Sequence, residues 1–231
     1  MPKQIYNWSR VKAGDIISFR YKGKKSTGTL TTLLVFNPRI PYTRKDGSKT
    51  FHLVGLKLEE AIQKLMPRDC EVEVNRLVQA YIDSFSRFRD EPEYTEPLYP
   101  GIRDCLNDLV SLGFSLGIAT GKSRRGLLRT LERHNLSELF CVLKTADDGP
   151  GKPNPDILLD AIDEVQTIAE KTAMIGDTIY DMIMAKEALV TAIGVSWGYH
   201  DTGELKEAGA RIIAKDCAEL QPALQALWRL P

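Results

Sequence analysis

The order of apolar and polar residues changes twice along the chain. Apolar and polar positions alternate over residues 15–21, and two further apolar runs cover residues 30–36 and 51–58, which predicts a β-rich segment in residues 1–56. Residues 58–92 then place apolar residues three and four positions apart, which is the spacing of amphipathic helices. The change of period indicates that a different kind of secondary structure begins near residue 57.

Strands and helices are predicted to alternate from about residue 101 onward. Strands are expected at residues 114–119, 140–145, 172–176, 190–196 and 211–214, and helices at residues 102–112, 123–135, 155–165, 179–188, 203–208 and 217–229. Such alternation predicts a parallel sheet with helices on both faces. We therefore expect three parts: a basic β-rich segment in residues 1–56, a helical segment with a linker in residues 57–97, and an α/β core in residues 98–231.

The composition is that of a globular protein, with 43% apolar and 27% charged residues. No apolar run approaches the roughly 18 residues that cross a bilayer, and the N-terminus lacks the apolar stretch of a secretory signal. The four cysteines are widely spaced and form no CxxC pair, as in reduced proteins of the cytosol. We expect a cytoplasmic protein that makes no contact with membranes.

The net charge of zero conceals two oppositely charged parts. Residues 1–57 hold twelve Lys or Arg against two Asp or Glu, a net charge of +10, and the remainder carries −10. Aromatic residues lie among the basic ones, so residues 1–57 can follow a phosphate backbone, and nucleic acid stays open as a partner. The competing interpretation is a solubilising basic face, and no recognition motif supports the binding of nucleic acid.

The first candidate loop follows the strand predicted to end at Ala119. It contains Thr120, Gly121, Lys122 and Ser123. A hydroxyl and the free amides of a helix start can hold a phosphate oxygen, helped by the helix dipole. An ordinary strand-to-helix turn with Ser123 as the N-cap explains the same residues.

Two further loops carry charged residues. Lys152 lies among prolines, which would aim its ammonium at a phosphoryl group or a carboxylate, whereas the alternative is a solvated surface lysine. Asp177 and Asp181 follow a predicted buried strand with the spacing GDxxxD, so both can share one face of a helical turn and hold Mg²⁺ through oxygen ligands. Their alternative roles are an N-cap for Asp177 and a solvated side chain for Asp181.

The order of these loops resembles motifs II, III and IV of phosphatases of the haloacid dehalogenase (HAD) superfamily. The stretches that most resemble its phosphoglycolate-phosphatase-like members are residues 54–56, 117–126, 145–148, 174–178 and 194–200. Residues 54–56 lead into the helical segment 58–92, which resembles the rear part of the family's helical cap. The likeness covers about residues 54–225. It implies an HAD-like Rossmannoid parallel sheet with a shortened helical cap.

The resemblance also implies an activity, which is Mg²⁺-dependent hydrolysis of a small phosphorylated metabolite through an aspartyl-phosphate intermediate. Thr120 would bind the phosphoryl group, with Gly121 and Lys122 beside the substrate. Lys152 would bridge the phosphoryl group and the nucleophile.

The same resemblance assigns the two carboxylates. Asp177 would bind Mg²⁺, and Asp181 would support the metal site or Lys152. Of the other candidates, His52, His134 and His200 lack metal-like spacing and are expected at the surface or at helix caps, and Trp197 is expected near the sheet.

The family's first motif, an apolar strand ending in DxDGT, is not recognisable in this sequence. The apolar run 33–36 ends at Asn37, where the nucleophilic aspartate would stand, and Asp46-Gly47-Ser48 follows Arg44 without a buried strand. Because that strand is central in the family's sheet, residues 32–36 are the natural candidate for its place. Two hypotheses stay open: a phosphatase impaired by the missing nucleophile, or a non-catalytic truncated domain fused to a basic N-terminal binding module.

Overall fold

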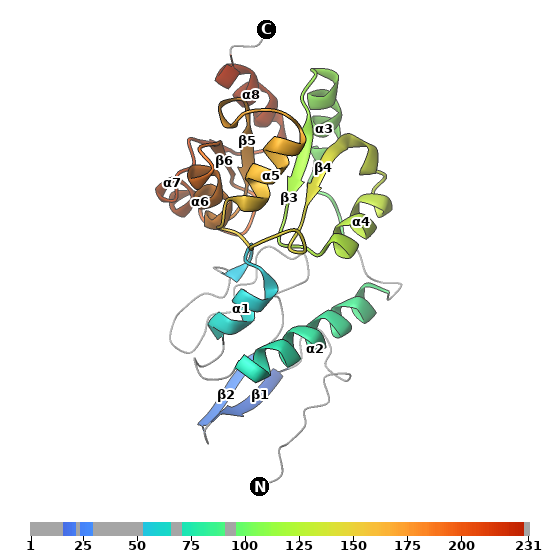
Figure 1. Cartoon of the computed structure of the whole chain (residues 1–231), viewed down its shortest axis with the longest axis vertical. Coiled ribbons are helices and arrows are strands. Elements are labelled where there is room, and N and C mark those ends of the chain that lie inside the picture. The colour runs from blue at the N-terminus through green and yellow to red at the C-terminus, as the bar shows by residue number, and fades with distance from the viewer. Residues whose placement is uncertain (1–15, 22–23, 30–52, 66–70, 91–95, 229–231) are drawn as a thin grey trace. The chain divides into compact units, whose positions relative to one another are not determined.

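The computed structural model describes residues 16–21, 24–29, 53–65, 71–90 and 96–228 (Figure 1). The chain divides into two units, one built from residues 1–54 with 58–96 and the other from residues 55–57 with 97–231. The predicted strand 32–36, Asn37 and the Asp46 turn lie outside the described residues. The division into three parts expected from the sequence stays a prediction.

The first unit contains a hairpin and two helices. Strands β1 (Ile16–Tyr21) and β2 (Lys24–Thr29) are antiparallel, with Ile16 opposite Thr29 and Tyr21 opposite Lys24. Helices α1 (Leu58–Leu65) and α2 (Glu71–Arg89) pack against each other and form where helical spacing was predicted. Their buried apolar residues include Ala61, Val74 and Val78.

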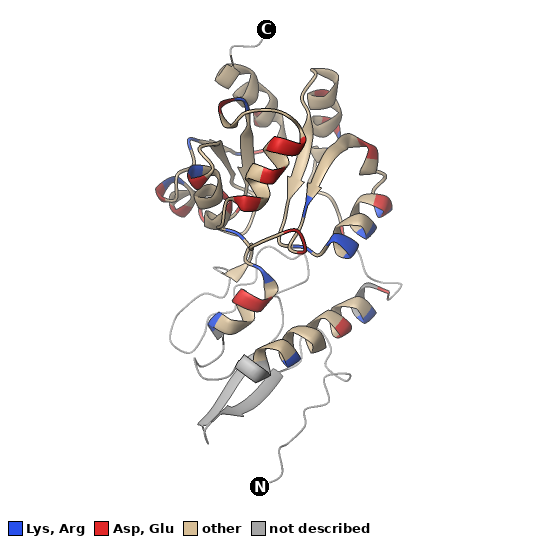
Figure 2. Cartoon of the chain, in the orientation of Figure 1, with Lys and Arg blue, Asp and Glu red and all other residues tan. Residues whose placement is uncertain are grey.

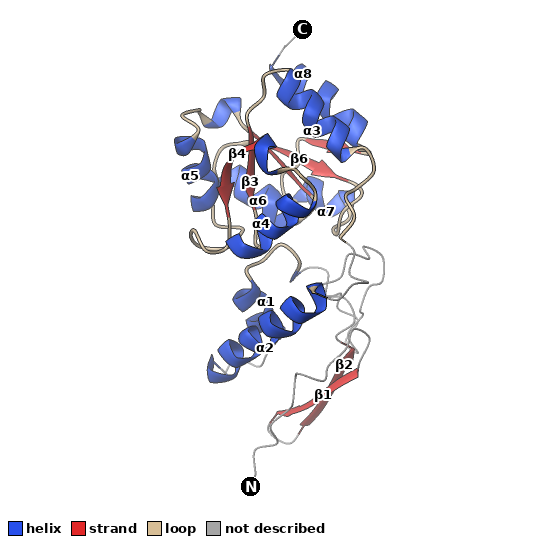
Figure 3. Cartoon of the chain, turned by 90° about the vertical axis from the view of Figure 1, so that its right-hand side faces the viewer, coloured by secondary structure: helices blue, strands red, loops and turns tan. Residues whose placement is uncertain are grey.

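The second unit alternates strands and helices from α3 onward, as predicted, with boundaries within a few residues of those expected (Figure 3). Its strands are β3 (Leu116–Ala119), β4 (Phe140–Lys144), β5 (Ala173–Gly176), β6 (Thr191–Val195) and β7 (Ile212–Ala214). Its α-helices are α3 (Ile102–Ser111), α4 (Arg124–Arg133), α5 (Asp156–Glu164), α6 (Ile179–Glu187), α7 (Thr202–Glu207) and α8 (Leu220–Trp228).

All strand pairs of this unit are parallel, which confirms the predicted sheet class. Strand β3 pairs with β4, and β5, β6 and β7 pair in that order, with Ala173 opposite Thr191 and Ile193 opposite Ile212. Among the described strands, β3 and β5 do not pair with each other. The strands therefore form one two-stranded and one three-stranded sheet, on either side of the place where the family's central strand would be expected.

Helices cover both faces of the three-stranded sheet. Helices α5, α6 and α7 share one core cluster with Ala192 of β6, whereas α3 and α8 share another with Ile193 and Val195. Successive residues of a strand point to opposite faces, so β6 needs apolar side chains on both sides and reads as a continuous apolar run. Trp197 packs against the second cluster, near the sheet as predicted.

A third cluster lies beside the two-stranded sheet. Leu127 and Leu131, one turn apart on α4, pack with Ile118 of β3 and Leu143 of β4. This packing fixes α4 directly after the loop that follows β3. Within the part of the chain that the structure describes, no helix has the length and apolar character needed to cross a bilayer.

Candidate active site

The three candidate loops follow the carboxyl ends of β3, β4 and β5, the edge where open α/β sheets bind ligands (Figure 1). The clearest contact between them is a buried ion pair. The ammonium of Lys152 lies 2.5 Å from Oδ1 of Asp181, and the two side chains are 8% and 4% exposed. Both were open to interpretation as solvated side chains, and that alternative is wrong.

Asp181 uses its second oxygen at the start of α6. Its Oδ2 accepts hydrogen bonds from the backbone amide of Thr178 at 3.1 Å and from the Thr178 hydroxyl at 2.7 Å. Thr178, the N-cap of α6, in turn accepts from the amide of Asp181, which completes a capping box. Because both oxygens of Asp181 are engaged, its geometry suits the positioning of Lys152 better than the coordination of a metal.

Asp177 differs from Asp181 in having an oxygen to spare. Its Oδ2 accepts a hydrogen bond from the amide of Tyr199 at 3.1 Å. The carboxylate is also stabilised by its own backbone amide, and among the described residues no other residue donates a hydrogen bond to Oδ1. Burial, reinforced by the charge of Asp181, raises the pKa of Asp177 to about 6. Thr178 rather than Asp177 caps α6, so the N-cap alternative for Asp177 is wrong.

The loop after β3 is held by its own backbone. The amide of Thr120 donates to the carbonyl of Lys144 at 2.9 Å, and its hydroxyl oxygen accepts from the amide of Lys122 at 3.2 Å. Ser123 caps α4 by accepting from the amide of Gly126 at 3.2 Å, as the structural alternative predicted. Among the described residues the Thr120 hydroxyl donates to no acceptor, whereas the amides of Lys122 and Gly126 already have acceptors.

The side chain of Lys122 turns toward α4. Its Nζ donates to the hydroxyl of Thr130 at 3.2 Å. In this arrangement Lys122 borders the loop through its backbone and stem rather than by aiming its ammonium at Thr120. Gly121 is tightly enclosed, because a Cβ there would lie 3.2 Å from the carbonyl oxygen of Leu56.

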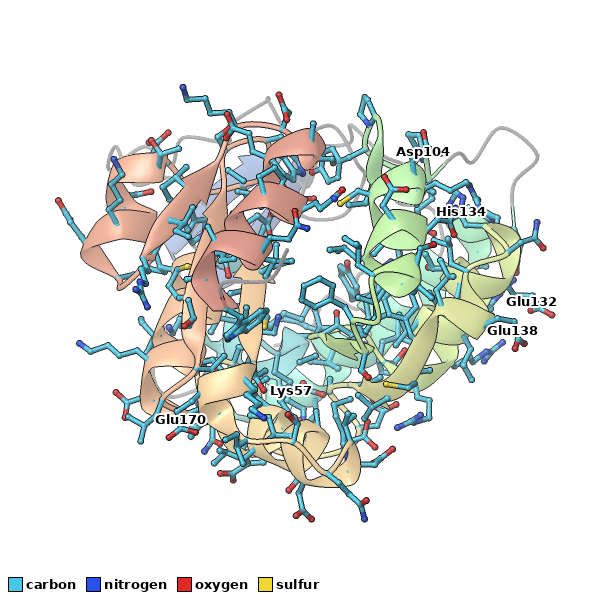
Figure 4. All side chains as sticks on the ribbon, turned by 90° about the horizontal axis from the view of Figure 1, so that it is seen from above. Lys57, Asp104, Glu132, His134, Glu138 and Glu170 are labelled. Atoms are coloured by element: carbon cyan, nitrogen blue, oxygen red, sulfur yellow. The ribbon has the colours of Figure 1, made fainter. Side chains whose placement is uncertain are left out.

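A turn at residues 55–57 contacts all three loops, although sequence reasoning assigned it no role in the site. Gly55 has φ of 99°, and a Cβ on it would lie 2.7 Å from the hydroxyl of Thr178. The ammonium of Lys57, labelled in Figure 4, lies 3.5 Å from the carbonyl of Gly149. The turn thus brings a second cation to the loop that carries Lys152, and the Val-Gly-Leu likeness was its sole sequence signal.

A network anchors the loop after β4 to α4. Asp148 accepts hydrogen bonds from the amide and the hydroxyl of buried Thr145, at 2.7 and 2.6 Å. It also accepts from Nη2 of Arg124, which lies 2.8 Å from its Oδ1 and 3.0 Å from its Oδ2. The hydroxyl bond from Thr145 is the main cause that lowers the pKa of Asp148 to about 2. The network holds the first part of the loop that leads to Lys152, a role the sequence did not reveal.

Charge is unevenly spread over this unit (Figure 2). Helix α4 begins at the loop after β3 and is rich in arginine, whereas α5 is rich in acidic residues. The basic residues of α4 are Arg124, Arg125, Arg129 and Arg133. Their positive potential favours the approach of an anion to the neighbouring loop.

Aromatic residues surround Asp177. The rings of Tyr99 and Trp197 meet edge to face with centroids 6.5 Å apart. Burial, and secondarily the charge of Asp177, raises the pKa of Tyr99, and burial raises the pKa of Tyr199 to about 12. Both phenols are therefore neutral at ordinary pH. His200, expected at the surface or at a cap, is not at the surface but is buried beside this group at 4% exposure.

The donor set for a metal is small. Among the described residues no group of three or more His, Cys, Asp or Glu side chains could hold a metal ion. Mg²⁺, however, is commonly bound through one or two carboxylates together with substrate phosphate and water. Oδ1 of Asp177 fits such a site, since no other described residue donates a hydrogen bond to it and burial disfavours the charged carboxylate, which a cation would stabilise.

Comparisons with known proteins bear on this geometry. A family model described as haloacid dehalogenase-like hydrolase matches residues 30–195. The probable phosphatase IndB of Dickeya dadantii is 34% identical over 180 residues, 77% of each chain, and a phosphoglycolate phosphatase of Agrobacterium fabrum is 29% identical over 175 residues, 75% of each. A solved hydrolase from Pseudomonas syringae matches with a TM-score of 0.67 and 25% identity, over 76% of this chain and 81% of that one.

Proposed function

The chain belongs to the haloacid dehalogenase-like hydrolases and is by family a hydrolase of phosphoric monoesters, and we propose that it acts on small phosphate monoesters with Mg²⁺ bound at Asp177. The observation that carries the proposal is the buried pair of Lys152 and Asp181 next to Asp177. A buried ion pair often contributes little net stability compared with apolar residues of similar size. Its presence at the ligand-binding edge therefore fits a catalytic purpose.

In this proposal each residue has a distinct task. The Thr120 hydroxyl donates to an oxygen of the phosphoryl group, with Gly121 and Lys122 forming the backbone wall beside it. Lys152, fixed by Asp181, presents its ammonium to the phosphoryl group and the nucleophile. Such a fixed charge needs no reorganisation during the reaction. When bound, Mg²⁺ would neutralise negative charge on the phosphoryl oxygens.

The nucleophile is the weakest element of the proposed chemistry, because an amide is a very poor substitute for a carboxylate nucleophile. Asn37 follows the apolar run 33–36, and both it and the N-terminal carboxylates Asp15 and Asp46 lie outside the described residues. We propose that turnover by this chain is slow, with Asn37 in the position of the family's nucleophile.

The proposed substrate is a small ester with a second negative charge, of the phosphoglycolate type. Similarity to a phosphoglycolate phosphatase supports this class. Lys57 adds a second ammonium close to the loop that carries Lys152, and α4 adds positive potential. A doubly anionic ester suits that concentration of positive charge.

The test is hydrolysis of 2-phosphoglycolate and of para-nitrophenyl phosphate with Mg²⁺. The intact chain, Asp177→Asn and Asn37→Asp are compared, with Asp160→Asn as a control because Asp160 is an exposed carboxylate on α5. We expect slow turnover by the intact chain and Asp160→Asn, none by Asp177→Asn, and at least a tenfold gain for Asn37→Asp.

Two results would contradict the proposal. Equal rates for the intact chain and Asp177→Asn would remove the metal role of Asp177. No turnover by any variant, including Asn37→Asp, would reject phosphatase activity for this chain.

A further inference from the structure

The loop after β6 lies directly against Asp177. Strands β5 and β6 are parallel neighbours, so their following loops meet at the same edge. The amide of Tyr199 donates to Oδ2 of Asp177, and the amide of His200 donates to the Asp177 backbone carbonyl, both at 3.1 Å. One loop therefore holds the side chain and the backbone of the same residue.

Gly198 makes this close approach possible. A Cβ at position 198 would lie 2.0 Å from Cβ of Asp177 and 2.5 Å from its Oδ2. Real side chains do not approach so closely, so any residue larger than glycine would displace the Asp177 carboxylate or the loop. The requirement comes from space, because Gly198 does not have a positive φ.

His200 fastens the residues that follow Asp177. Its Nδ1 accepts a hydrogen bond from the amide of Ile179, the first residue of α6, at 3.1 Å. An accepting Nδ1 carries no proton, so the ring is the tautomer protonated at Nε2. The first amides of a helix lack partners within the helix, and here the capping box satisfies those of Thr178 and Asp181 while His200 satisfies that of Ile179.

The ring of His200 is also packed. It meets the ring of Tyr180 at 66° with centroids 6.0 Å apart, and it is almost fully buried. Packing and hydrogen bonding therefore fix the imidazole together. A side chain that is restrained in this way restrains in turn the start of α6, two residues after Asp177.

We propose that residues 197–200 form a clamp that orients Asp177 toward a divalent cation, and that His200 is its positioning residue. A cap of α6 alone would require just the bond to Ile179. The bond from Tyr199 to the carboxylate and the close approach at Gly198 are directed at Asp177 itself. The inference rests on the proposed role of Asp177 and adds residues that act through it.

A matched pair of variants separates the hydrogen bond from the packing. His200→Asn places an amide oxygen near the position of Nδ1 and keeps the acceptor for Ile179, whereas His200→Phe keeps an aromatic ring against Tyr180 and loses the acceptor. The probe is Mn²⁺, titrated into the full chain and followed by electron paramagnetic resonance. We expect His200→Phe to weaken Mn²⁺ binding about tenfold or more, and His200→Asn to stay within about threefold of the wild type.

A pair of glycine variants tests the clamp independently, should His200→Phe fail to fold. Gly198→Ala is expected to weaken Mn²⁺ binding about tenfold or more. Gly203→Ala is the control, because a Cβ there meets nothing within 4 Å. Circular dichroism verifies that each variant is folded, and Asp177→Asn gives the reference for binding elsewhere on the chain.

The outcomes distinguish the two proposals. Wild-type affinity in folded His200→Phe and Gly198→Ala would overturn the clamp and leave the metal role of Asp177 intact, and so would equal losses in His200→Asn and His200→Phe. If the wild type binds Mn²⁺ no better than Asp177→Asn, both the clamp and the metal role of Asp177 are wrong. A structural role alone would lower the thermal midpoint of His200→Phe without changing its affinity for Mn²⁺.

Discussion

The loops after β5 and β3 both place polar groups at the carboxyl edge of a sheet, but they differ in how those groups are buried and hydrogen-bonded. After β5, Thr178 and Asp181 are buried and bonded to each other, and Asp181 also holds Lys152. After β3, Thr120 is half-buried and Ser123 is exposed, and the bonds of this turn are mainly those of its own backbone.

The difference follows the kind of group that each loop presents. A charge withdrawn from water must be paired and hydrogen-bonded, or its burial costs several kcal/mol. The loop after β5 carries such charges and therefore forms a closed set of contacts. The loop after β3 offers a neutral hydroxyl beside a basic helix, which can stay near solvent until an anion arrives. In these two loops the more extensive side-chain bonding accompanies the buried charges.

The largest effect is expected from removing the Lys152 ammonium, which is paired with Asp181. Lys152→Met keeps the length of the side chain but leaves the carboxylate of Asp181 buried without its partner. We expect the free energy of unfolding to fall by about 3 to 5 kcal/mol, measured by urea denaturation. Lys152→Met with Asp181→Asn should lose clearly less than the sum of the single losses, and a loss below about 1 kcal/mol for Lys152→Met would show that the pair is not buried in solution.

The second prediction concerns the cost of charging Asp177. Its pKa is about 6 in the folded chain against an ordinary 3.8, so the folded chain holds this proton more tightly than the unfolded chain. Stability therefore falls as pH rises through the interval between these two values. Asp177→Asn removes that cost, and we expect it to stabilise the metal-free protein at pH 8 by about 1 to 3 kcal/mol.

The check is urea unfolding at pH 4, 6 and 8 in the presence of a chelator. The advantage of Asp177→Asn should shrink to less than about 1 kcal/mol at pH 4, where the wild-type carboxyl is protonated in the folded chain and, with an ordinary pKa of 3.8, is roughly half ionised in the unfolded chain. Asp160→Asn, on the exposed surface of α5, is the control for the loss of one negative charge. A destabilised Asp177→Asn at pH 8 would contradict the prediction.

The smallest effect compares the two helix caps directly. Thr178 is buried and both accepts from and donates to Asp181, whereas Ser123 is exposed and caps α4 through the amide of Gly126. Thr178→Ala should cost about 2 kcal/mol and Ser123→Ala about 0.5 to 1 kcal/mol. Thermal unfolding of the two variants measures the difference. Equal losses would show that the two caps contribute equally to stability.

The spacing of apolar residues was sufficient to predict the type and position of the strands and helices in the second unit. Each of these elements is either long enough to show a helical repeat or apolar enough to indicate a buried strand. The same reasoning placed Thr120, Lys152 and Asp177 at strand ends. It did not pair Lys152 with Asp181, since a contact between residues 29 positions apart depends on which strands are neighbours.

Hydrogen bonds donated by backbone amides could not be predicted from the sequence, for a different reason. The backbone amide of Tyr199 donates to the carboxylate of Asp177. Every residue except proline has such an amide, so the identity of residue 199 does not indicate this contact. His200 was expected to be a surface or cap residue, and the surface half of that expectation is wrong because its burial follows from the adjacency of β5 and β6. The sequence shows a glycine at position 198, but the reason for it, the lack of space for a Cβ beside Asp177, is apparent only in the structure.

The ion pair between Lys152 and Asp181 has a consequence for how the second unit comes apart. It joins the loop after β4 to the helix after β5, and so it spans two sheets whose described strands share no hydrogen bonds. If one half opened while the other stayed closed, a charge of this pair would remain buried without its partner, which is a state of high free energy. The halves should therefore open together, and hydrogen exchange of amides in β4 and β5 should report one cooperative event rather than two.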